Sequence, residues 1–480
     1  MRVLLLHPPA TRRSYLSRFG LDEPLIPIFL APDLSRRHEL RLVDLRLAPD
    51  LRRELAGWRP EVALVGVNLL TLGALDRCLG ELRALAPEVR VLLYAEGEYG
   101  NSQVEARPAD YFHPLADAVV APYFLAPMRE VVEGALRALE DRRPLAEAPG
   151  LWLQEPHGSW TLTAPVANRV GDVGVPDRSV LGRYRGRYMF AGIRNAAHLI
   201  YTYGCKFKCR FCPMSRHDGT IFVRGLDGVL AELAAMSERN VFLEDYEPFL
   251  APDAMVALAD GVERAGIRKN WYMLTRADSA LEHEELIARW KKLGLRWLYL
   301  GLDGSNPERL REIRKASSME TNERALRRMQ ALGLAVTAGF VVRPDYTSAD
   351  FAALREAVAR LRPPLVTYTV ETPLPGTQLF DDVREHITSF DWSLYDLQHA
   401  LLPTSLPLEE FYGEMARLHF ASGVRNLPVM LRHYPPLDLL RLWVLGMGAV
   451  RDLRRSARDH GRPGAAAGAP QGMQPTLARA

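Results

Sequence analysis

Residues 203–213 read YGCKFKCRFCP and contain three of the four cysteines of this 480-residue chain. Cys205, Cys209 and Cys212 have the spacing C-x3-C-x2-C, which allows one tight loop to direct three thiolates toward one point. Soft, closely packed thiolates select zinc, copper(I) or an iron–sulfur cluster. A [4Fe–4S] cluster normally takes four cysteines, so three would leave one iron open to a further ligand. The basic residues between the cysteines are expected to lower the pKa values of the thiols.

The loop resembles the cluster-binding loop of the radical S-adenosylmethionine (SAM) superfamily, in which an aromatic residue, here Phe211, precedes the last cysteine. The resemblance implies a [4Fe–4S] cluster whose open iron binds the amino and carboxylate groups of SAM, and reductive cleavage of SAM to a 5′-deoxyadenosyl radical. The alternative is a zinc site with His217 as the fourth ligand. Zinc sites usually present two separated ligand pairs, and the sequence offers no second pair.

The composition, with 48% hydrophobic and 25% charged residues, is typical of a globular protein. A net charge of only +3 indicates no nucleic-acid partner. No run of about 18 apolar residues occurs, so no transmembrane helix is expected. The remaining cysteine, Cys78, has no partner outside the loop, which excludes a disulfide framework and favours a reducing, cytoplasmic location. We expect a monomer in which Cys78 is a small buried hydrophobe.

Residues 1–145 alternate short apolar runs with helical stretches, which predicts an α/β domain with a doubly wound, Rossmann-like parallel sheet. Ligands of such sheets bind at the carboxyl ends of the strands. The predicted strands are Val3–His7, Arg41–Asp44, Val62–Val67, Val89–Tyr94 and Ala118–Val120. This layout, with an opening strand that ends in two prolines, resembles the cobalamin-binding domain that precedes many radical SAM barrels.

That resemblance implies cobalamin contacts at the strand ends, from His7, Pro8, Pro9, Leu70, Thr71, Glu96, Gly97 and Tyr123. Two segments depart from the pattern of the family. Glu96 and Gly97 stand where relatives often have paired glycines, and residues 121–124 read APYF in place of Gly-Glu-Gly-Glu. Glycine matters there because the backbone passes close to the corrin or its nucleotide tail. The alternative is a domain of the same fold that has lost or repurposed its ligand.

Residues 146–195 are predicted to be a linker, with a small hairpin formed by Leu151–Gln154 and Trp160–Thr163. A strand and a helix then recur six times across residues 196–385. Six such units predict a partial (β/α)6 TIM-type barrel, the fold of the radical SAM core. The predicted strands are His198–Tyr203, Val241–Glu244, Asn270–Leu274, Trp297–Gly301, Ala335–Val341 and Leu365–Val370.

Chemistry in parallel barrels gathers at the carboxyl ends of the strands. At these ends the resemblance implies SAM contacts from Phe211, Glu244, Asp245, Arg276, Asp303, Ser305 and Gly339. The charged residues have alternatives: the adjacent acids could cap the helix that begins near Pro252, and Arg276 could pair with Asp278 or Asp303. The sixth strand end, TPLPGT at residues 372–377, resembles a segment common in cobalamin-associated radical SAM enzymes.

Residues 386–455 are predicted to be a helical region, and residues 456–480, rich in Gly, Ala, Pro and Arg, a disordered tail. In the family, aromatic stretches close the barrel mouth, which makes Trp392, Tyr395 and His399 candidates for substrate contact, with core packing as the alternative. The apolar stretch Leu437–Val450 is too short to span a bilayer. It is either a buried helix or one that lies on a membrane surface or faces an apolar substrate.

Together these resemblances imply a radical SAM enzyme that methylates an unactivated carbon of a small-molecule substrate, such as a natural-product or lipid precursor, with cobalamin as methyl carrier. An external electron donor such as flavodoxin or ferredoxin would reduce the cluster. The carboxyl ends of the N-terminal sheet must then face the barrel mouth. Two alternatives stay open: a radical SAM rearrangement, cyclisation or oxidation without methyl transfer, and a metal-bound interaction protein that is not an enzyme.

Overall fold

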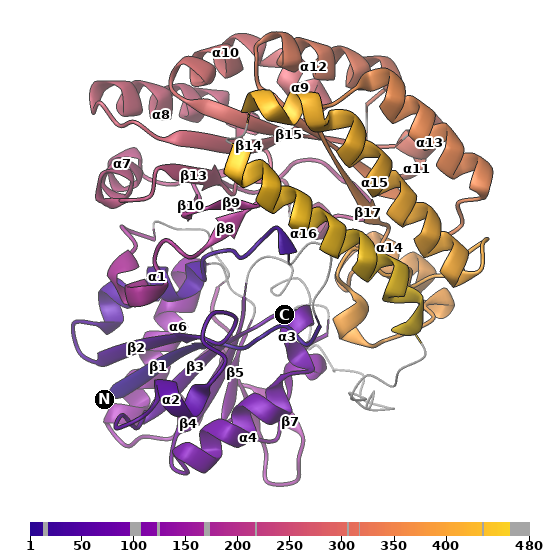
Figure 1. The fold of residues 1–480 in the computed structure, drawn as a ribbon. Coiled ribbons are helices and arrows are strands. Elements are labelled where there is room, and N and C mark those ends of the chain that lie inside the picture. Colours follow the sequence, from indigo (N-terminus) through magenta and orange to yellow (C-terminus); the bar gives the residue numbers. More distant parts are fainter. Residues whose placement is uncertain are drawn as a thin grey trace.

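The computed structural model contains two α/β units and a helical hairpin, which confirms the predicted architecture (Figure 1). The first unit is built on a seven-stranded sheet and the second on a six-stranded sheet. The structure describes residues 1–12, 18–96, 107–121, 125–167, 173–216, 218–304, 307–315, 317–433 and 436–460. Most of the predicted tail, residues 461–480, lies outside them.

The first sheet has a parallel core of five strands, as predicted. They are β1 (Arg2–His7), β2 (Glu39–Asp44), β3 (Val62–Val67), β4 (Arg90–Ala95) and β5 (Ala118–Val120), in the order β2-β1-β3-β4-β5. The helices of this unit are α1 (Leu25–Leu34), α2 (Leu51–Glu54), α3 (Leu69–Leu72), α4 (Leu75–Leu85) and α6 (Leu125–Glu140). Every residue of β3 is buried because α1 and α6 cover one face of the sheet and α2 and α4 the other.

The predicted hairpin is confirmed, but it extends the first sheet. Strand β6 (Leu151–Gln154) pairs antiparallel with β5, and β7 (Trp160–Leu162) pairs antiparallel with β6. The Trp160 ring stacks on Phe112 with ring centroids 4.6 Å apart, which ties the hairpin to the N-terminal unit. The following short helix η4 (Arg178–Tyr184) packs against α1 and β2.

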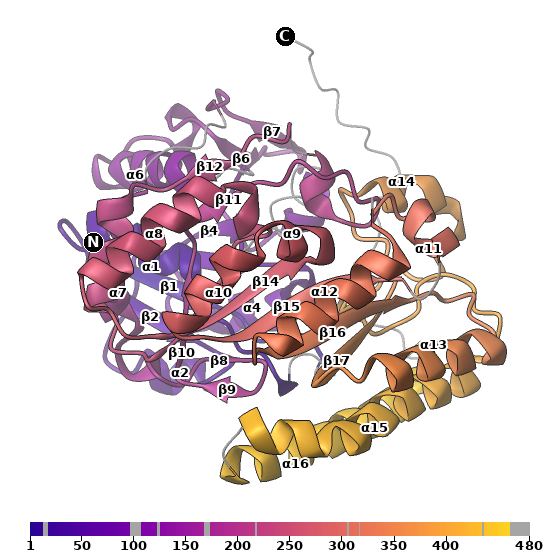
Figure 2. The same cartoon turned by 90° about the horizontal axis from the view of Figure 1, so that it is seen from above.

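The second sheet is entirely parallel. Its strands, in order across the sheet, are β10 (Ala196–Leu199), β13 (Asn240–Leu243), β14 (Asn270–Arg276), β15 (Leu295–Asp303), β16 (Ala335–Val342) and β17 (Leu365–Val370). The outer strands β10 and β17 do not pair within the described residues, so the barrel is open, as predicted. Its outer helices are α7 (Leu226–Ala235), α8 (Pro252–Arg264), α9 (Ala277–Glu282), α10 (Glu284–Lys292), α11 (Pro307–Glu312), α12 (Met319–Ala331) and α13 (Ser348–Leu361) (Figure 2).

Two long helices, α15 (Leu408–His433) and α16 (Pro436–Arg455), lie side by side next to the last strand of the barrel (Figures 1 and 2). Helix α15 packs against β17 and α13. The predicted apolar helix is thus confirmed, although α16 continues past Val450 to Arg455. Within the described ranges, no helix has the length and apolar character needed to cross a membrane.

Arg178 joins the two units and is almost completely buried. Its guanidinium pairs with Glu232 of α7 (2.6 Å) and with Glu23 ahead of α1 (3.4 Å), and it donates to the carbonyl oxygen of His198 on β10. Glu23 also accepts a hydrogen bond from the backbone N–H of His198 (2.8 Å). One buried network therefore connects the N-terminal unit, the linker and the barrel.

Replacing Arg178 with glutamine should destabilise the protein by about 3–5 kcal/mol, because Glu23 would remain buried without its counter-charge. Urea denaturation would show this as a lower midpoint. Arg183→Gln is the matched control, since that exposed guanidinium pairs with Glu54 at the surface and its loss should cost less than about 1 kcal/mol. Equal shifts in the two variants would contradict a structural role for the buried network.

Candidate active site

One cavity of about 1690 Å³ lies between the carboxyl ends of the two sheets and is lined by residues of both. The sequence-predicted residues that line it are His7, Pro9, Leu70, Thr71, Glu96, Cys205, Cys209, Phe211, Cys212, Glu244, Arg276, Asp303 and Tyr395. The prediction that the N-terminal sheet faces the barrel mouth is therefore confirmed. Gly97, Tyr123, Ser305 and the alternative zinc ligand His217 lie outside the described residues.

Asp245 holds the backbone that leads into the cysteine loop. Its carboxylate accepts hydrogen bonds from the N–H groups of Tyr201 (2.8 Å) and Thr202 (2.7 Å) and from the Thr202 hydroxyl (2.7 Å). It is fully buried, does not line the cavity, and its pKa is raised by burial to about 7. The predicted SAM contact at Asp245 is therefore wrong. The alternative is wrong too, because α8 begins after Ala251 without a side-chain cap.

Gly204 makes the sharp entry into the loop possible. Its φ is +114°, in the region that favours glycine, and a Cβ there would collide with the carbonyl oxygen of Thr220. Beyond it, Cys209 is buried while Cys205 and Cys212 are partly exposed. One loop thus brings all three sulfurs to the wall of the same cavity.

The thiols are less acidic than the sequence predicts. Burial raises the pKa values of Cys205 and Cys209, and raises that of Cys212 to about 12, so the flanking basic residues do not dominate. Within the described residues, no three Cys, His, Asp or Glu side chains form a group that could hold a metal ion. In a four-iron cluster each thiolate binds a different iron, so the ligand sulfurs lie further apart than those that bind a single metal ion. Cys78 is buried in α4, as predicted.

Arg276 lies over the cysteine loop from the end of β14. Its guanidinium stands 3.7 Å from the centroid of the Phe207 ring and donates to Cys209 Sγ (3.8 Å). The same guanidinium pairs with Asp278 (2.8 Å), as the alternative interpretation predicted. Arg276 therefore keeps a positive charge beside the cysteines while a second group fixes its orientation.

Glu247 is a residue that the sequence analysis left out. Its carboxylate accepts hydrogen bonds from the Thr275 hydroxyl and the Arg276 N–H, both at 2.7 Å, and it lines the cavity. Burial raises its pKa to about 7. It follows Glu244 and Asp245 at the end of β13, and this run of acids was the available signal.

Glu244 lines the cavity and pairs with His198 (2.6 Å) on the neighbouring strand. Burial opposes a charged imidazole, but the carboxylate of Glu244 raises the pKa of His198 to about 9. At neutral pH the pair is therefore an ion pair. Its carboxylate is partly exposed to the cavity and is available to a cationic ligand group.

The end of β15 carries a second ion pair. Asp303, whose backbone has a φ of +57°, binds Lys315 (2.5 Å), and both side chains line the cavity. On the next strand, Gly339 does not reach the cavity, because the side chain of Tyr299 covers it and lines the cavity instead. The predicted approach of adenine to the Gly339 backbone is therefore wrong.

At the first sheet, His7 and Glu96 mark the cavity wall. Burial lowers the pKa of His7 to about 4, and its Nδ1 contacts the carbonyl oxygen of Pro8 (2.9 Å), so the imidazole is neutral. Pro8 itself does not line the cavity. Burial raises the pKa of Glu96 to about 7. The charge that Glu96 places at this wall is therefore reduced near neutral pH.

Leu70 and Thr71 reach the cavity from α3. The helix is capped by Asn68, whose side chain accepts from the Leu70 N–H (3.0 Å), while the Thr71 hydroxyl accepts from the Asn68 N–H (2.9 Å). This reciprocal cap fixes the turn that follows β3.

The predicted substrate contacts are mainly packing residues. Trp392 and Tyr395 belong to a buried cluster with Leu69 of α3. Of these two aromatic residues, Tyr395 lines the cavity and Trp392 does not. His399 is buried away from it and pairs with Asp396 (2.9 Å). Burial disfavours its charge, but Asp396 raises the pKa of His399 to about 9. The alternative of core packing is therefore correct for Trp392 and His399.

Helices α15 and α16 supply a wall that the sequence analysis did not assign in detail. The cavity contacts His419 and Phe420 of α15, and it contacts α16 through mostly apolar residues between Leu439 and Val450. Burial lowers the pKa of His419 to about 3, so this imidazole is neutral. The apolar helix thus faces the cavity.

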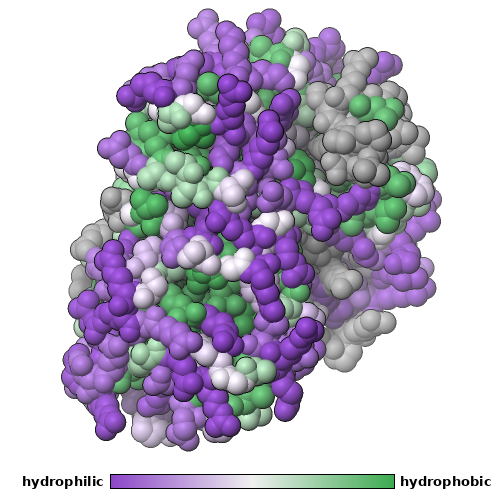
Figure 3. Space-filling view, turned by 60° about the vertical axis from the view of Figure 1, so that its left-hand side comes forward, coloured by the Kyte–Doolittle hydropathy of each residue, from purple (hydrophilic) through white to green (hydrophobic). Residues whose placement is uncertain are grey.

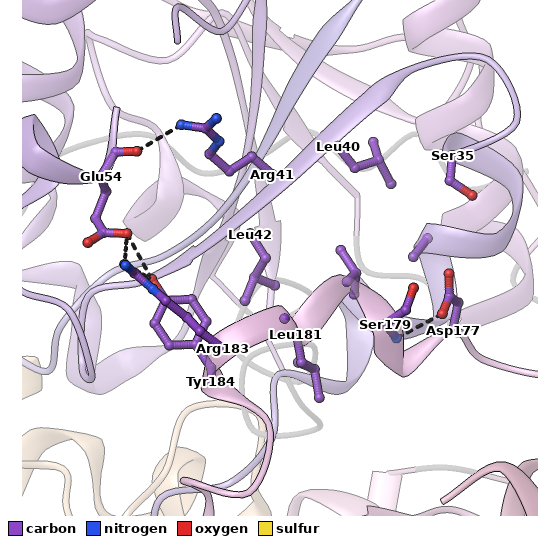
Figure 4. A pocket seen from close by; sticks show the side chains of 13 residues that line it. Ser35, Leu40, Arg41, Leu42, Glu54, Asp177, Ser179, Leu181, Arg183 and Tyr184 are labelled. Atoms are coloured by element: carbon purple, nitrogen blue, oxygen red, sulfur yellow. Dashed lines mark hydrogen bonds and ion pairs between the residues drawn. The ribbon is translucent and has the colours of Figure 1, made fainter. Parts of the chain in front are cut away.

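A separate cavity of about 510 Å³ lies against the first sheet, between α1, β2 and η4 (Figure 4). Arg183 and the Tyr184 hydroxyl both contact the Glu54 carboxylate, and Arg41 donates to the Glu54 carbonyl oxygen (3.0 Å). No residue of the cysteine loop lines it. Its polar groups bind one another, so the larger cavity is the candidate active site.

Comparison with known proteins agrees with this assignment. Residues 199–358 match the radical SAM superfamily. The hopanoid C-3 methylase of Methylococcus capsulatus is 29% identical over 422 residues, which cover 87% of this chain and 79% of that protein. The bacteriochlorophyllide d C-12(1)-methyltransferase of Chlorobaculum tepidum is 26% identical over 231 residues, which cover 46% of this chain and 50% of that protein.

Among solved structures, the cobalamin-dependent SAM radical enzyme OxsB, with aqua-cobalamin and SAM bound, superimposes with a TM-score of 0.67 at 14% identity. The match covers 94% of this chain and 71% of that one, so the likeness of fold includes the N-terminal unit, the barrel and the segment between them. The chain is therefore a radical SAM enzyme, whose two α/β units have the fold seen in OxsB.

Proposed function

We propose that this enzyme methylates an unactivated carbon of a large, mainly apolar lipid, with cobalamin as the methyl carrier. The observation that carries the proposal is the single cavity, which joins the cysteine loop, the strand ends of the cobalamin-type sheet and an apolar helical wall. Radical formation, methyl transfer and substrate binding need such a shared space, because their reacting atoms must come into contact.

Cys205, Cys209 and Cys212 would hold a [4Fe–4S] cluster. When bound, the cluster and SAM would supply the radical that removes a hydrogen atom from carbon, and cobalamin the methyl group. The residues of the chain position these groups. The Glu244 carboxylate would accept from the SAM ammonium group, and the ion-paired Lys315 and Asp303 would bind its carboxylate or ribose. An external donor would provide the electron.

The first sheet fits a corrin that is held without a histidine ligand. The neutral His7 is buried and engaged with Pro8, and the neighbouring wall is formed by uncharged residues of α3. The raised pKa of Glu96 reduces its charge, and a protonated carboxyl could donate to a corrin amide. Glu96 nevertheless places bulk where a corrin would lie, which favours the second candidate: radical chemistry without methyl transfer.

Two observations support a lipid as the substrate class: the apolar wall of the cavity and the name of one relative. The residues that α16 turns toward the cavity are leucines, Trp443, Gly446, Met447 and Val450. The Methylococcus capsulatus relative is named for methylation of a hopanoid, a polycyclic lipid. A fused apolar ring system is therefore the substrate that we propose to test first.

The test is anaerobic reconstitution with iron, sulfide, SAM and cobalamin, followed by incubation with hopanoid lipids, SAM labelled in its methyl group and reduced flavodoxin or ferredoxin as the electron donor. The expected result is a labelled methylated lipid, with 5′-deoxyadenosine and S-adenosylhomocysteine formed in matching amounts. Cys209→Ala should abolish all three products, and Cys78→Ala should leave them unchanged. 5′-Deoxyadenosine without a labelled lipid, over a panel of polycyclic lipids, would instead support the second candidate.

Replacing Arg276 with glutamine should slow formation of 5′-deoxyadenosine about tenfold, since groups that orient and neutralise cluster ligands have effects of this size. In the parent protein the positive charge of Arg276 favours the reduced cluster, which carries more negative charge. Without that charge, the reduction potential of the cluster should become more negative. A redox titration followed by electron paramagnetic resonance would measure the potential.

Arg210→Gln is the matched control for Arg276→Gln. Arg210 lies in the same loop, but its guanidinium pairs with Asp382 (2.8 Å) at the surface. The potential of that variant should stay close to that of the parent protein. A shift of equal size in both variants would show that the effect is general to the loop and not specific to the contact with Cys209.

A further inference from the structure

The exposed apolar side chains of the enzyme are concentrated on its C-terminal helices. Six of the eleven large hydrophobic residues exposed in the described part of the chain belong to α15 and α16: Phe420, Leu431, Leu440, Trp443, Val444 and Met447. The face drawn in Figure 3 is mainly hydrophilic, with apolar side chains in separate patches. Large apolar patches on a folded protein mark sites of interaction.

On α16 these residues form one continuous face. Leu440, Trp443, Val444 and Met447 are three or four residues apart, which places them on one side of the helix. The other side is firmly packed: Ala449 and Leu453 are buried, and Asp452 pairs with Arg18 (2.5 Å). The apolar face is therefore presented by a helix that is fixed in place.

At the C-terminal end of α16 the apolar face is followed by a cluster of arginines. Arg451, Arg454 and Arg455 continue the spacing of the apolar residues, are exposed, and form no ion pair within the described ranges. A helix with an apolar face and an arginine cluster binds the interface of an anionic bilayer, and tryptophan prefers that depth. Asp452, the acidic residue of α16 whose side chain is described, lies off this face, so in a second copy docked helix to helix it would offer these arginines no counter-charge.

The apolar face also borders the active-site cavity. Trp443, Met447 and Phe420 are at least 40% exposed and yet line the cavity, so the cavity opens at this patch. A molecule that leaves a bilayer at this point would enter the cavity without crossing water. The geometry thus connects a surface suited to a membrane with the space that holds the cysteines.

We propose that the exposed face of α15 and α16 docks on an anionic bilayer and that the substrate enters the cavity from it. The second half of this statement rests on the proposed function, whereas docking does not. Arginines would contact lipid phosphates, and Leu440, Trp443 and Val444 would lie among the acyl chains near the headgroups.

Sedimentation of the full-length reconstituted enzyme with vesicles tests the docking. The enzyme should bind vesicles of phosphatidylcholine and phosphatidylglycerol more tightly than phosphatidylcholine alone, and the difference should shrink as salt is raised. The double variant Leu440→Ser with Val444→Ser should bind about tenfold more weakly. Neither residue lines the cavity, so its release of 5′-deoxyadenosine from SAM should be unchanged, which shows that the variant is folded.

The matched control is Leu162→Ser with Val256→Ser, two exposed apolar residues on β7 and α8, which should bind vesicles like the parent. Arg451→Gln with Arg454→Gln and Arg455→Gln should remove the preference for phosphatidylglycerol. Equal vesicle binding by the parent and the Leu440/Val444 variant would overturn the proposal. So would a parent dimer that this variant dissociates, since a second copy would then cover the face.

If docking is found but no lipid is methylated, the membrane surface stands and the proposed function fails. If lipid supplied in detergent is methylated by the parent and by the Leu440/Val444 variant alike, whereas lipid in vesicles is methylated by the parent alone, both are supported. Vesicle binding and lipid methylation therefore test the docking and the proposed function separately.

Discussion

Two buried carboxyl groups fix the backbone beside the cysteine loop, one at the entry to the loop and one at the end of β14, from which Arg276 reaches it. Asp245 binds two amides and a hydroxyl just ahead of the loop, and Glu247 binds the amide of Arg276 and the hydroxyl of Thr275. Both groups are shielded from water, where a lost hydrogen bond has no ready substitute. The entry to the loop and the position of Arg276 are thereby fixed by side chains that follow β13. If the three sulfurs hold one cluster, as proposed, their positions must be fixed in this way.

The shared cavity depends in turn on contacts between the two units, because neither sheet alone determines where its strand ends point. The Arg178 network closes one side of the junction. On the other side, Leu69 of the N-terminal unit packs with Leu374, which follows the last barrel strand, and with Trp392 of the C-terminal region. Trp392, which the sequence analysis expected to touch substrate, therefore packs at the junction of the two units instead.

Strand ends were predictable from the sequence because parallel strands that are covered on both faces read as apolar runs, and their ends follow directly. This explains why Glu244, Arg276 and Asp303 were placed correctly on the cavity wall. The sequence could not separate Glu244 from Asp245. The two are neighbours, and their roles differ because successive side chains point to opposite sides, one toward the cavity and one toward Tyr201 and Thr202.

The errors share a physical cause, which is a partner distant in sequence. Gly339 reads as a place of close backbone approach, and it is one, but the approaching group is the Tyr299 ring from the adjacent strand. The thiol pKa values rise because burial outweighs the neighbouring cations, and the degree of burial is set by the whole cavity. His399 pairs with Asp396 nearby, yet its burial depends on the packing of the C-terminal region.

Charge and apolar surface are separated along the cavity, and this separation bears on how one carbon could be selected. Charged side chains gather around the cysteines, from Glu244 and Glu247 to Arg276, Asp303 and Lys315, whereas α16 supplies an apolar wall. Burying a fused hydrocarbon against α16 would be favourable in proportion to the area removed from water, while pushing it among paired charges would cost their solvation. Such a substrate would therefore extend only to the point where the apolar wall gives way to charged side chains. The reacting carbon would be the one whose distance along the molecule matches that boundary, with no specific polar group needed to identify it.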